Sequence, residues 1–174
     1  PSDGGPVAVP SQDMVLGIYY LTQERPGDKG EGMFFKSPNE AILAYENDAV
    51  TLPARIKVRV KKTMADGTVK TDIVETTVGR ILFNEIIPQD LGFVDRTIPE
   101  NELKFEIDFL VQKKQLKQIL EKVINTHGAM QTAITLDDIK AIGYKYSTRA
   151  AMTVSISDMT VPASKKQLLA DAES

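Results

Sequence analysis

The segment from Val9 to Thr22 constrains the fold most, because it predicts an almost wholly apolar helix with a polar start. Pro10 ends any preceding extended segment, and Ser11 is a favourable N-cap residue. Gln12 and Asp13 fall in the first turn, where an acidic side chain interacts favourably with exposed backbone N–H groups. Taken alone, the segment is best explained as a capped core helix. We expect protein around it, so that only its polar start can meet a ligand; its apolar residues are Met14, Val15, Leu16, Ile18, Tyr19, Tyr20 and Leu21.

The composition excludes several classes of protein. With 24 acidic and 21 basic residues and a formal net charge of -3, the chain has no general attraction for nucleic acid, so such contacts need a local basic patch. The absence of cysteine excludes disulfides and thiolate metal sites. No apolar run approaches the roughly 20 residues that span a membrane, and no signal-peptide pattern is present. The missing initial Met predicts a piece of a longer polypeptide.

The remaining patterns predict an α+β fold of mixed helices and short antiparallel strands or hairpins. Ser37-Pro38-Asn39-Glu40 is a complete helix start, and we expect that helix to bury Ile42, Leu43 and Tyr45. Thr77 caps another helix, and Gly128 ends a long one. An irregular segment precedes residue 10, and a polar helix follows Pro162. The predicted helices cover about 12–21, 38–46, 78–87, 113–126 and 135–146, and the predicted strands cover 33–35, 55–62, 68–76, 105–109 and 152–156.

The strand from Arg55 to Lys62 alternates between apolar and basic residues, and Asp66-Gly67 supplies the turn of a hairpin. The basic side chains Arg55, Lys57, Arg59 and Lys61 could bind phosphate, or they could form a solvated sheet surface. We favour the solvated surface, because Asp72 and Glu75 on the returning strand can partly neutralise it.

No pattern in the chain predicts an active site of its own. The nucleophile elbow, the P-loop and the dinucleotide fingerprint are all absent, and Gly30-Glu31-Gly32 is too short to count. No Asp-x-Asp-x-Asp cluster is available to hold magnesium. The single histidine, His127, sits at a predicted helix end, where it can satisfy carbonyls and the negative end of the dipole. A zinc site is excluded without a second histidine or a cysteine.

Four ordered motifs carry a more specific signal. Positions 10–22 read P-S-Q-D-x-V-L-G-x-Y-Y-x-T, and G-E-G-M follows at 30–33. T-T-V-G-R occupies 76–80, G-Y-K-Y-S-T-R occupies 143–149, and S-I-S-D-M with V-P close behind occupies 155–162. In this order they resemble the bacterial RNA polymerase β′ subunit, in the region after its magnesium-binding catalytic loop. The chain departs from the family pattern in the 91–100 loop and the 63–72 hairpin.

This resemblance implies a pore domain, domain 3 of the largest subunit, over residues 1–157, and the start of the funnel and rim region, domain 4, over 158–174. In the family, the Asp triplet that holds magnesium precedes this region, and the bridge helix and trigger loop follow it. The region between helps to wall the secondary channel, through which nucleotides enter and into which backtracked RNA is extruded. The chain alone is therefore expected to be inactive and without a cofactor, with the magnesium and zinc of the intact enzyme bound elsewhere.

The resemblance also implies site residues. Gln12 and Asp13 match the Gln-Asp pair near the active centre, and Lys113 and Lys114 match a paired-lysine position that faces the channel. Two adjacent ammonium groups would attract triphosphate or displaced RNA, although a solvated helix start remains the alternative. Arg80, in the Thr-x-Gly pattern, is added to this channel-facing group, with packing or an inter-subunit contact as its alternative role.

The implied partners are the β, α, ω and σ subunits, the rest of β′, nucleoside triphosphates, backtracked RNA and Gre-type cleavage factors. The implied location is the bacterial nucleoid in the cytoplasm, with no membrane contact. The alternative hypothesis is a free-standing module that binds RNA or an acidic protein through the Arg55–Lys61 strand. The two hypotheses differ on the length of the native polypeptide.

Overall fold

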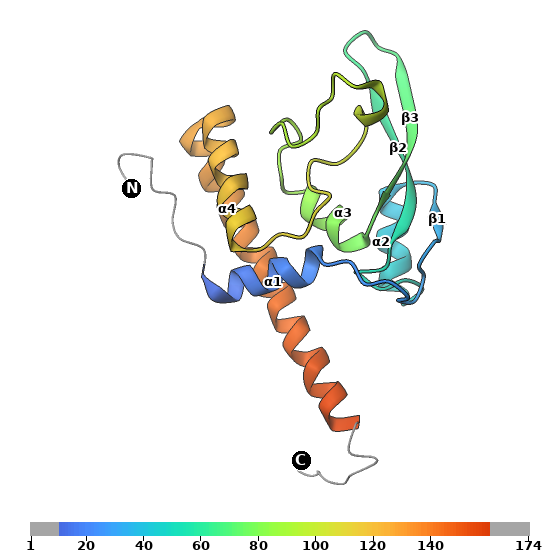
Figure 1. Cartoon of the computed structure of the whole chain (residues 1–174), viewed down its shortest axis with the longest axis vertical. Helices are drawn as coiled ribbons and strands as arrows, with labels where there is room; N and C mark the ends of the chain where they lie inside the picture. Colours follow the sequence, from blue (N-terminus) through green and yellow to red (C-terminus); the bar gives the residue numbers. More distant parts are fainter. Residues whose placement is uncertain (1–10, 161–174) are drawn as a thin grey trace.

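The computed structural model describes residues 11–160, with side chains through residue 152, and has the predicted α+β fold (Figure 1). A small sheet with α2 beside it lies on one side, the long helix α4 on the other, and α1 and α3 between them. The elements in chain order are α1 (Gln12–Thr22), β1 (Phe34–Phe35), α2 (Pro38–Glu46), β2 (Ile56–Thr63), β3 (Val69–Thr76), α3 (Val78–Asn84), a short 3₁₀ helix (Pro99–Asn101) and α4 (Lys113–Thr160).

The predicted helix starts are confirmed by their capping hydrogen bonds. The hydroxyl of Ser11 accepts from the Met14 N–H at 3.1 Å, and the hydroxyl of Ser37 accepts from the Glu40 N–H at 3.1 Å. Glu40 in turn accepts from the Lys36 N–H at 2.6 Å, one residue before the cap, so its side chain reaches back beyond the helix start as the Glu of a capping box does. Each cap satisfies a backbone donor that the first helical turn would otherwise leave without a partner.

The sheet has the strand order β1-β2-β3. The β2–β3 hairpin is antiparallel as predicted, with Ile56 opposite Thr76 and Thr63 opposite Val69. Its turn contains Gly67, whose φ of 88° lies in the region that glycine adopts most readily. The prediction of antiparallel strands alone was wrong for β1, because Phe34 and Phe35 pair in parallel with β2.

Helix α1 lies at the centre of the structure, and glycines permit its closest contacts (Figure 1). A Cβ atom added at Gly17 would lie 1.7 Å from the carbonyl oxygen of Gly143 in α4. A Cβ added at Gly79 of α3 would lie 1.8 Å from the carbonyl oxygen of Leu21 at the end of α1. Both distances are far below van der Waals contact, so the backbones can approach this closely only because side chains are absent.

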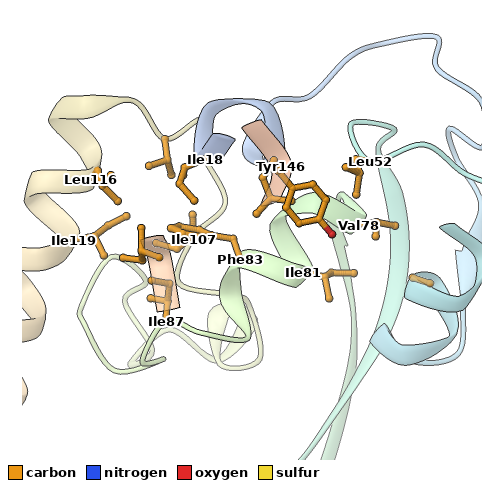
Figure 2. Close-up of a cluster of buried hydrophobic side chains, with 14 of the residues drawn as sticks. Ile18, Leu52, Val78, Ile81, Phe83, Ile87, Ile107, Leu116, Ile119 and Tyr146 are labelled. Atoms are coloured by element: carbon orange, nitrogen blue, oxygen red, sulfur yellow. The ribbon is translucent and has the colours of Figure 1, made fainter. Parts of the chain in front are cut away.

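These contacts enclose one apolar core that α1, α3, α4 and the sheet share. Figure 2 shows Ile18 of α1 and Phe83 of α3 in the same cluster as Leu116 and Ile119 of α4. Ile107, from the segment before α4, is also fully buried in this cluster. The core therefore fixes α1 against both the sheet side and the α4 side of the molecule.

The prediction of a wholly enclosed α1 was only partly right. Met14, Ile18 and Leu21 are buried, but Leu16 is 50% exposed and Tyr19 is 38% exposed. The burial predicted for α2 was wrong for Leu43, which is 56% exposed, whereas Ile42 and Tyr45 are partly buried against the core and Ala41 is fully buried. In both cases the pattern identified apolar positions, but the neighbouring elements cover only one face of the helix.

The predicted strand over 105–109 does not form, although side chains satisfy backbone groups of Glu106 and Ile107. The Asn84 side chain donates to the Ile107 carbonyl at 2.9 Å and accepts from the Ile107 N–H at 2.9 Å. The Gln89 side chain accepts from the Glu106 N–H at 3.0 Å. Side-chain amides thus replace the neighbouring strand that the alternating pattern implied.

The predictions after residue 128 were also wrong in part. Gly128, with a φ of 88°, interrupts α4 as expected of a residue that ends a helix. Helix then continues to Thr160, so the predicted strand at 152–156 is helical and the helix predicted to begin at Thr135 begins earlier. The segments before residue 11 and after residue 160, including the helix predicted from Pro162, lie outside the described residues.

Candidate functional site

Gln12 and Asp13 lie in the first turn of α1, and both side chains are exposed. Because Ser11 caps this turn, the Asp13 carboxylate is not needed as the cap. Its charge still interacts favourably with the positive end of the helix dipole. The polar start of an otherwise largely buried helix is therefore accessible, as the sequence predicted.

Lys113 and Lys114 are the first two residues of α4, and both are exposed. Here the Gln115 side chain accepts from the Gln112 N–H at 3.0 Å, so an uncharged group forms the local hydrogen bond at the helix start. The two ammonium groups lie at the positive end of the helix dipole, which opposes them. The pair therefore places two exposed positive charges at the helix start.

Arg80, by contrast, is only 5% exposed. Its Nε donates to the Thr22 carbonyl at 2.9 Å, and its Nη1 lies 3.3 Å from Asp108 and 3.5 Å from Glu24. Burial lowers the pKa of the Arg80 guanidinium, while the charges of Asp108 and Glu24 raise it. In the described chain Arg80 holds the end of α1 to α3 and to the segment before α4, which is its alternative packing role.

The residues expected to face a channel are thus not gathered into one cluster. Arg80 contacts the last residue of α1, whereas Gln12 and Asp13 lie at the opposite end of that helix. At the helical rise per residue, these ends are roughly 15 Å apart. Within residues 11–152, no hydrogen bond or ion pair joins Gln12 or Asp13 to Lys113 or Lys114.

The sequence did not reveal an ion-pair network at the sheet side of Arg80. Arg55 lies 3.0 Å from Glu24, 3.5 Å from Glu75 and 3.7 Å from Asp108, and Arg80 shares two of these carboxylates. Glu24 and Asp108 come from irregular segments, so no periodic spacing could have identified them. Together the two arginines connect segments distant in sequence, which indicates a structural role.

The described side chains offer no metal centre, because no group of three or more His, Cys, Asp or Glu residues lies close enough together. His127 was expected to satisfy carbonyls at the end of its helix, but its Nε2 lies 2.7 Å from Asp90 Oδ1. Two cavities of about 370 Å³ and 330 Å³ lie on the sheet side, and Phe105 lines both. No helix among residues 11–160 is both long and apolar enough to cross a membrane.

Comparison with known proteins adds the decisive observation: the family model for RNA polymerase Rpb1, domain 3, matches residues 1–159. The chain belongs to this RNA polymerase largest-subunit family. It is 69% identical over 173 residues to the DNA-directed RNA polymerase subunit beta′ of Lachnoclostridium phytofermentans, and 58% identical to that of Clostridium botulinum strain Langeland. The corresponding subunit of Caldicellulosiruptor saccharolyticus is 57% identical.

These alignments cover 99% of this chain but only 14–15% of each of the three relatives. The resemblance drawn from the four motifs is therefore confirmed. Three motif glycines, Gly17, Gly79 and Gly143, now have a physical explanation, because each lies where two backbones nearly touch. The domain boundary predicted between residues 157 and 158 stays a prediction. Helix α4 passes through this position without interruption and continues to Thr160.

Proposed function

We propose that this chain is part of a β′ subunit of a bacterial DNA-directed RNA polymerase and contributes a wall of the secondary channel used by nucleotides and backtracked RNA. The similarity to named β′ subunits along 99% of the chain supports this assignment over a free-standing binding module. The chain supplies a rigid surface beside a catalytic centre that other residues form.

The exposed pair Lys113–Lys114 is the observation on which the channel assignment depends. Adjacent cations at the start of a helix, held in place by the buried Leu116 and Ile119, give a fixed positive potential. A triphosphate or the phosphates of displaced RNA would be drawn to it by charge. Gln12 and Asp13 would supply hydrogen-bonding groups nearer the active centre, on the exposed turn of α1.

Exposed apolar side chains support assembly into a larger enzyme. Leu16, next to Gly17 in α1, is 50% exposed, and Tyr144, next to Gly143 in α4, is 70% exposed. Met130 of α4 is 81% exposed. Contiguous patches of exposed apolar side chains normally contact other protein. The rest of β′ and the β, α, ω and σ subunits would cover them, while Gre-type cleavage factors would reach the mouth of the channel.

The described carboxylates do not fit a magnesium site, so no chemical step is assigned to this chain. In the proposed assembly the magnesium and the zinc are bound by other parts of the enzyme. The residues of this chain would instead attract, orient and guide anionic substrates. The proposed location is the bacterial cytoplasm, at the nucleoid.

The test is a polymerase assembled with a β′ subunit that carries Lys113→Ala and Lys114→Ala together. We expect the apparent KM for nucleotides to rise about three- to tenfold at low salt, with a smaller effect at high salt, because ions screen the lost attraction. Cleavage of backtracked transcripts should change as well. Both are measured on stalled elongation complexes.

The matched control removes two positive charges from exposed loop positions, by Lys29→Ala with Lys36→Ala. It should leave nucleotide use and cleavage unchanged. Equal kinetics in the Lys113/Lys114 variant and the control, at every salt concentration, would refute the channel-facing role.

A further inference from the structure

The outward face of the small sheet combines positive charge with exposed apolar surface. In β2 every second residue from Lys57 to Lys61 is basic, and the side chains of Lys57, Arg59 and Lys61 are all exposed. The neighbouring residues Ile56 and Val58 are fully buried. The cations therefore project from one face of the sheet. In β3 their cross-strand neighbours are Glu75, Ile73 and Thr71.

The same face carries apolar side chains from β1 and β3. Phe34 of β1 lies opposite Lys57 and is 45% exposed, and the Arg59 guanidinium lies 5.7 Å from the centre of its ring. Ile73 and Val69 of β3 are 53% and 57% exposed. We call the surface formed by Phe34, Lys57, Arg59, Lys61, Val69 and Ile73 the outer sheet face. The parallel pairing of β1 with β2, which the sequence did not predict, brings the aromatic ring next to the arginine.

Charge on this face is poorly balanced. Glu75 is the carboxylate on β3 that shares the face with the three cations, and Arg55 already lies 3.5 Å from it. Asp72 is on the same strand, but it pairs with Val60, whose side chain is on the opposite face. A partner with negative charge would thus meet three exposed cations and little repulsion.

We propose that the outer sheet face is a docking surface for an acidic protein segment that also carries apolar side chains. The carboxylates of the segment would pair with Lys57, Arg59 and Lys61. Its apolar side chains would cover Ile73, Val69 and the open side of Phe34. Both parts are needed, because exposed ion pairs alone contribute little to affinity and apolar contact alone would not select an acidic partner.

A protein partner fits this face better than RNA does. Sequence-tolerant RNA binding uses aromatic rings as stacking platforms for the bases, but the ring of Phe34 is already next to Arg59. The other apolar side chains, Val69 and Ile73, are aliphatic and offer no ring for stacking. Their shape and flexibility suit aliphatic side chains of a protein segment instead.

The face, rather than the free edge of β3, is the docking surface. The Lys57 N–H donates to the Met33 carbonyl at 2.9 Å, toward β1, so the backbone groups of Glu75 and of Ile73 point away from β2 at the edge. A further strand would pair there, but the Asp72 carboxylate already accepts from the Ile73 N–H at 2.8 Å. This hydrogen bond and the negative charge of the Asp72 carboxylate both oppose the addition of an acidic strand.

The test measures binding of fluorescent probes to the full chain at low and high salt. The probes are a synthetic peptide in which glutamate and leucine alternate with serine, the same peptide with glutamine for glutamate, and a short oligouridine RNA. We expect the glutamate peptide to bind at least about tenfold more tightly than the glutamine peptide, with the difference reduced by salt. The RNA should bind more weakly than the glutamate peptide.

Variants locate the site. Arg59→Glu with Lys61→Glu should weaken binding of the glutamate peptide at least about tenfold, and Ile73→Ser should weaken both peptides. The control Lys140→Glu reverses a charge on α4, away from the sheet, and should change nothing. Circular dichroism checks that each variant is folded.

Three outcomes would each overturn the proposal: no binding of the glutamate peptide, tighter binding of RNA than of that peptide, or equal binding of the peptide by the variants and the control. None of these outcomes bears on Lys113 and Lys114, so the proposed channel role stands or falls separately.

Discussion

Replacing Gly17 with alanine tests whether the α1–α4 contact determines the fold. The added Cβ would lie 1.7 Å from the Gly143 carbonyl oxygen, 2.6 Å from its carbonyl carbon and 2.9 Å from its Cα. All three atoms belong to the backbone of α4, which cannot move aside as a flexible side chain can. The two helices must therefore separate, which opens the core around Ile18.

Two opposing contributions set the size of the effect. Alanine is favoured over glycine inside a helix by about 1 kcal/mol. Overpacking costs about 1–3 kcal/mol or more, and the high end applies because rigid backbone opposes the new atom. We expect the free energy of unfolding to fall by about 2 kcal/mol, which for a chain of this size lowers Tm by about 4–8 °C.

The other side of the same contact supplies the control. A Cβ at Gly143 would meet the Met14 carbonyl oxygen at 2.9 Å and the flexible Met14 side chain at 3.1 Å, so the clash is milder. Gly143→Ala brings the same gain in helix propensity and should be close to neutral. Urea denaturation followed by circular dichroism gives both values. If Gly17→Ala proves as stable as Gly143→Ala, the packing explanation of these glycines is wrong.

Substitutions at three further positions test buried polar side chains. Thr22→Val should cost about 1–3 kcal/mol, because the Thr22 hydroxyl that accepts from the Val111 N–H at 3.0 Å is lost, whereas Thr22→Ser should retain most of the stability in urea denaturation. Asn84→Leu should cost at least about 2 kcal/mol in the same assay, since both backbone groups of Ile107 lose their partner. Burial raises the pKa of the Tyr146 phenol above its ordinary value of 10.0, so the folded state favours the protonated form. Its contribution to stability is complete below pH 10.0 and is lost as the pH rises through the folded-state pKa, and Tyr146→Phe should lose less stability over that range.

The contrast between Arg80 and the lysine pair shows what a motif can predict about a site. The motif containing Arg80 was recognised correctly, yet the side chain is buried against Thr22, Glu24 and Asp108. No spacing in the sequence places those three residues around one guanidinium. Lys113 and Lys114 are exposed as predicted, because charged side chains at a helix start have water available unless another element covers them.

Local sequence determined much of the fold. Ser11, Ser37 and Thr77 cap the helices that follow them, and Asp66-Gly67 forms the turn of the hairpin. Each of these signals depends on hydrogen bonds between residues a few positions apart, so each can be recognised in the sequence without knowledge of the rest of the chain. The order of the motifs also identified the family correctly.

Only the tertiary structure decided the features that depend on distant partners. The 105–109 segment alternates like a strand, but the side chain of Asn84, from another element, takes the backbone groups that a strand would have paired. The segment at 152–156 is rich in β-formers, yet the helix that α1 crosses at Gly143 continues through it to Thr160. Propensity and alternation differ by small free energies per residue, so the hydrogen bonds from Asn84 outweigh them at 105–109 and the extension of a helix already formed outweighs them at 152–156.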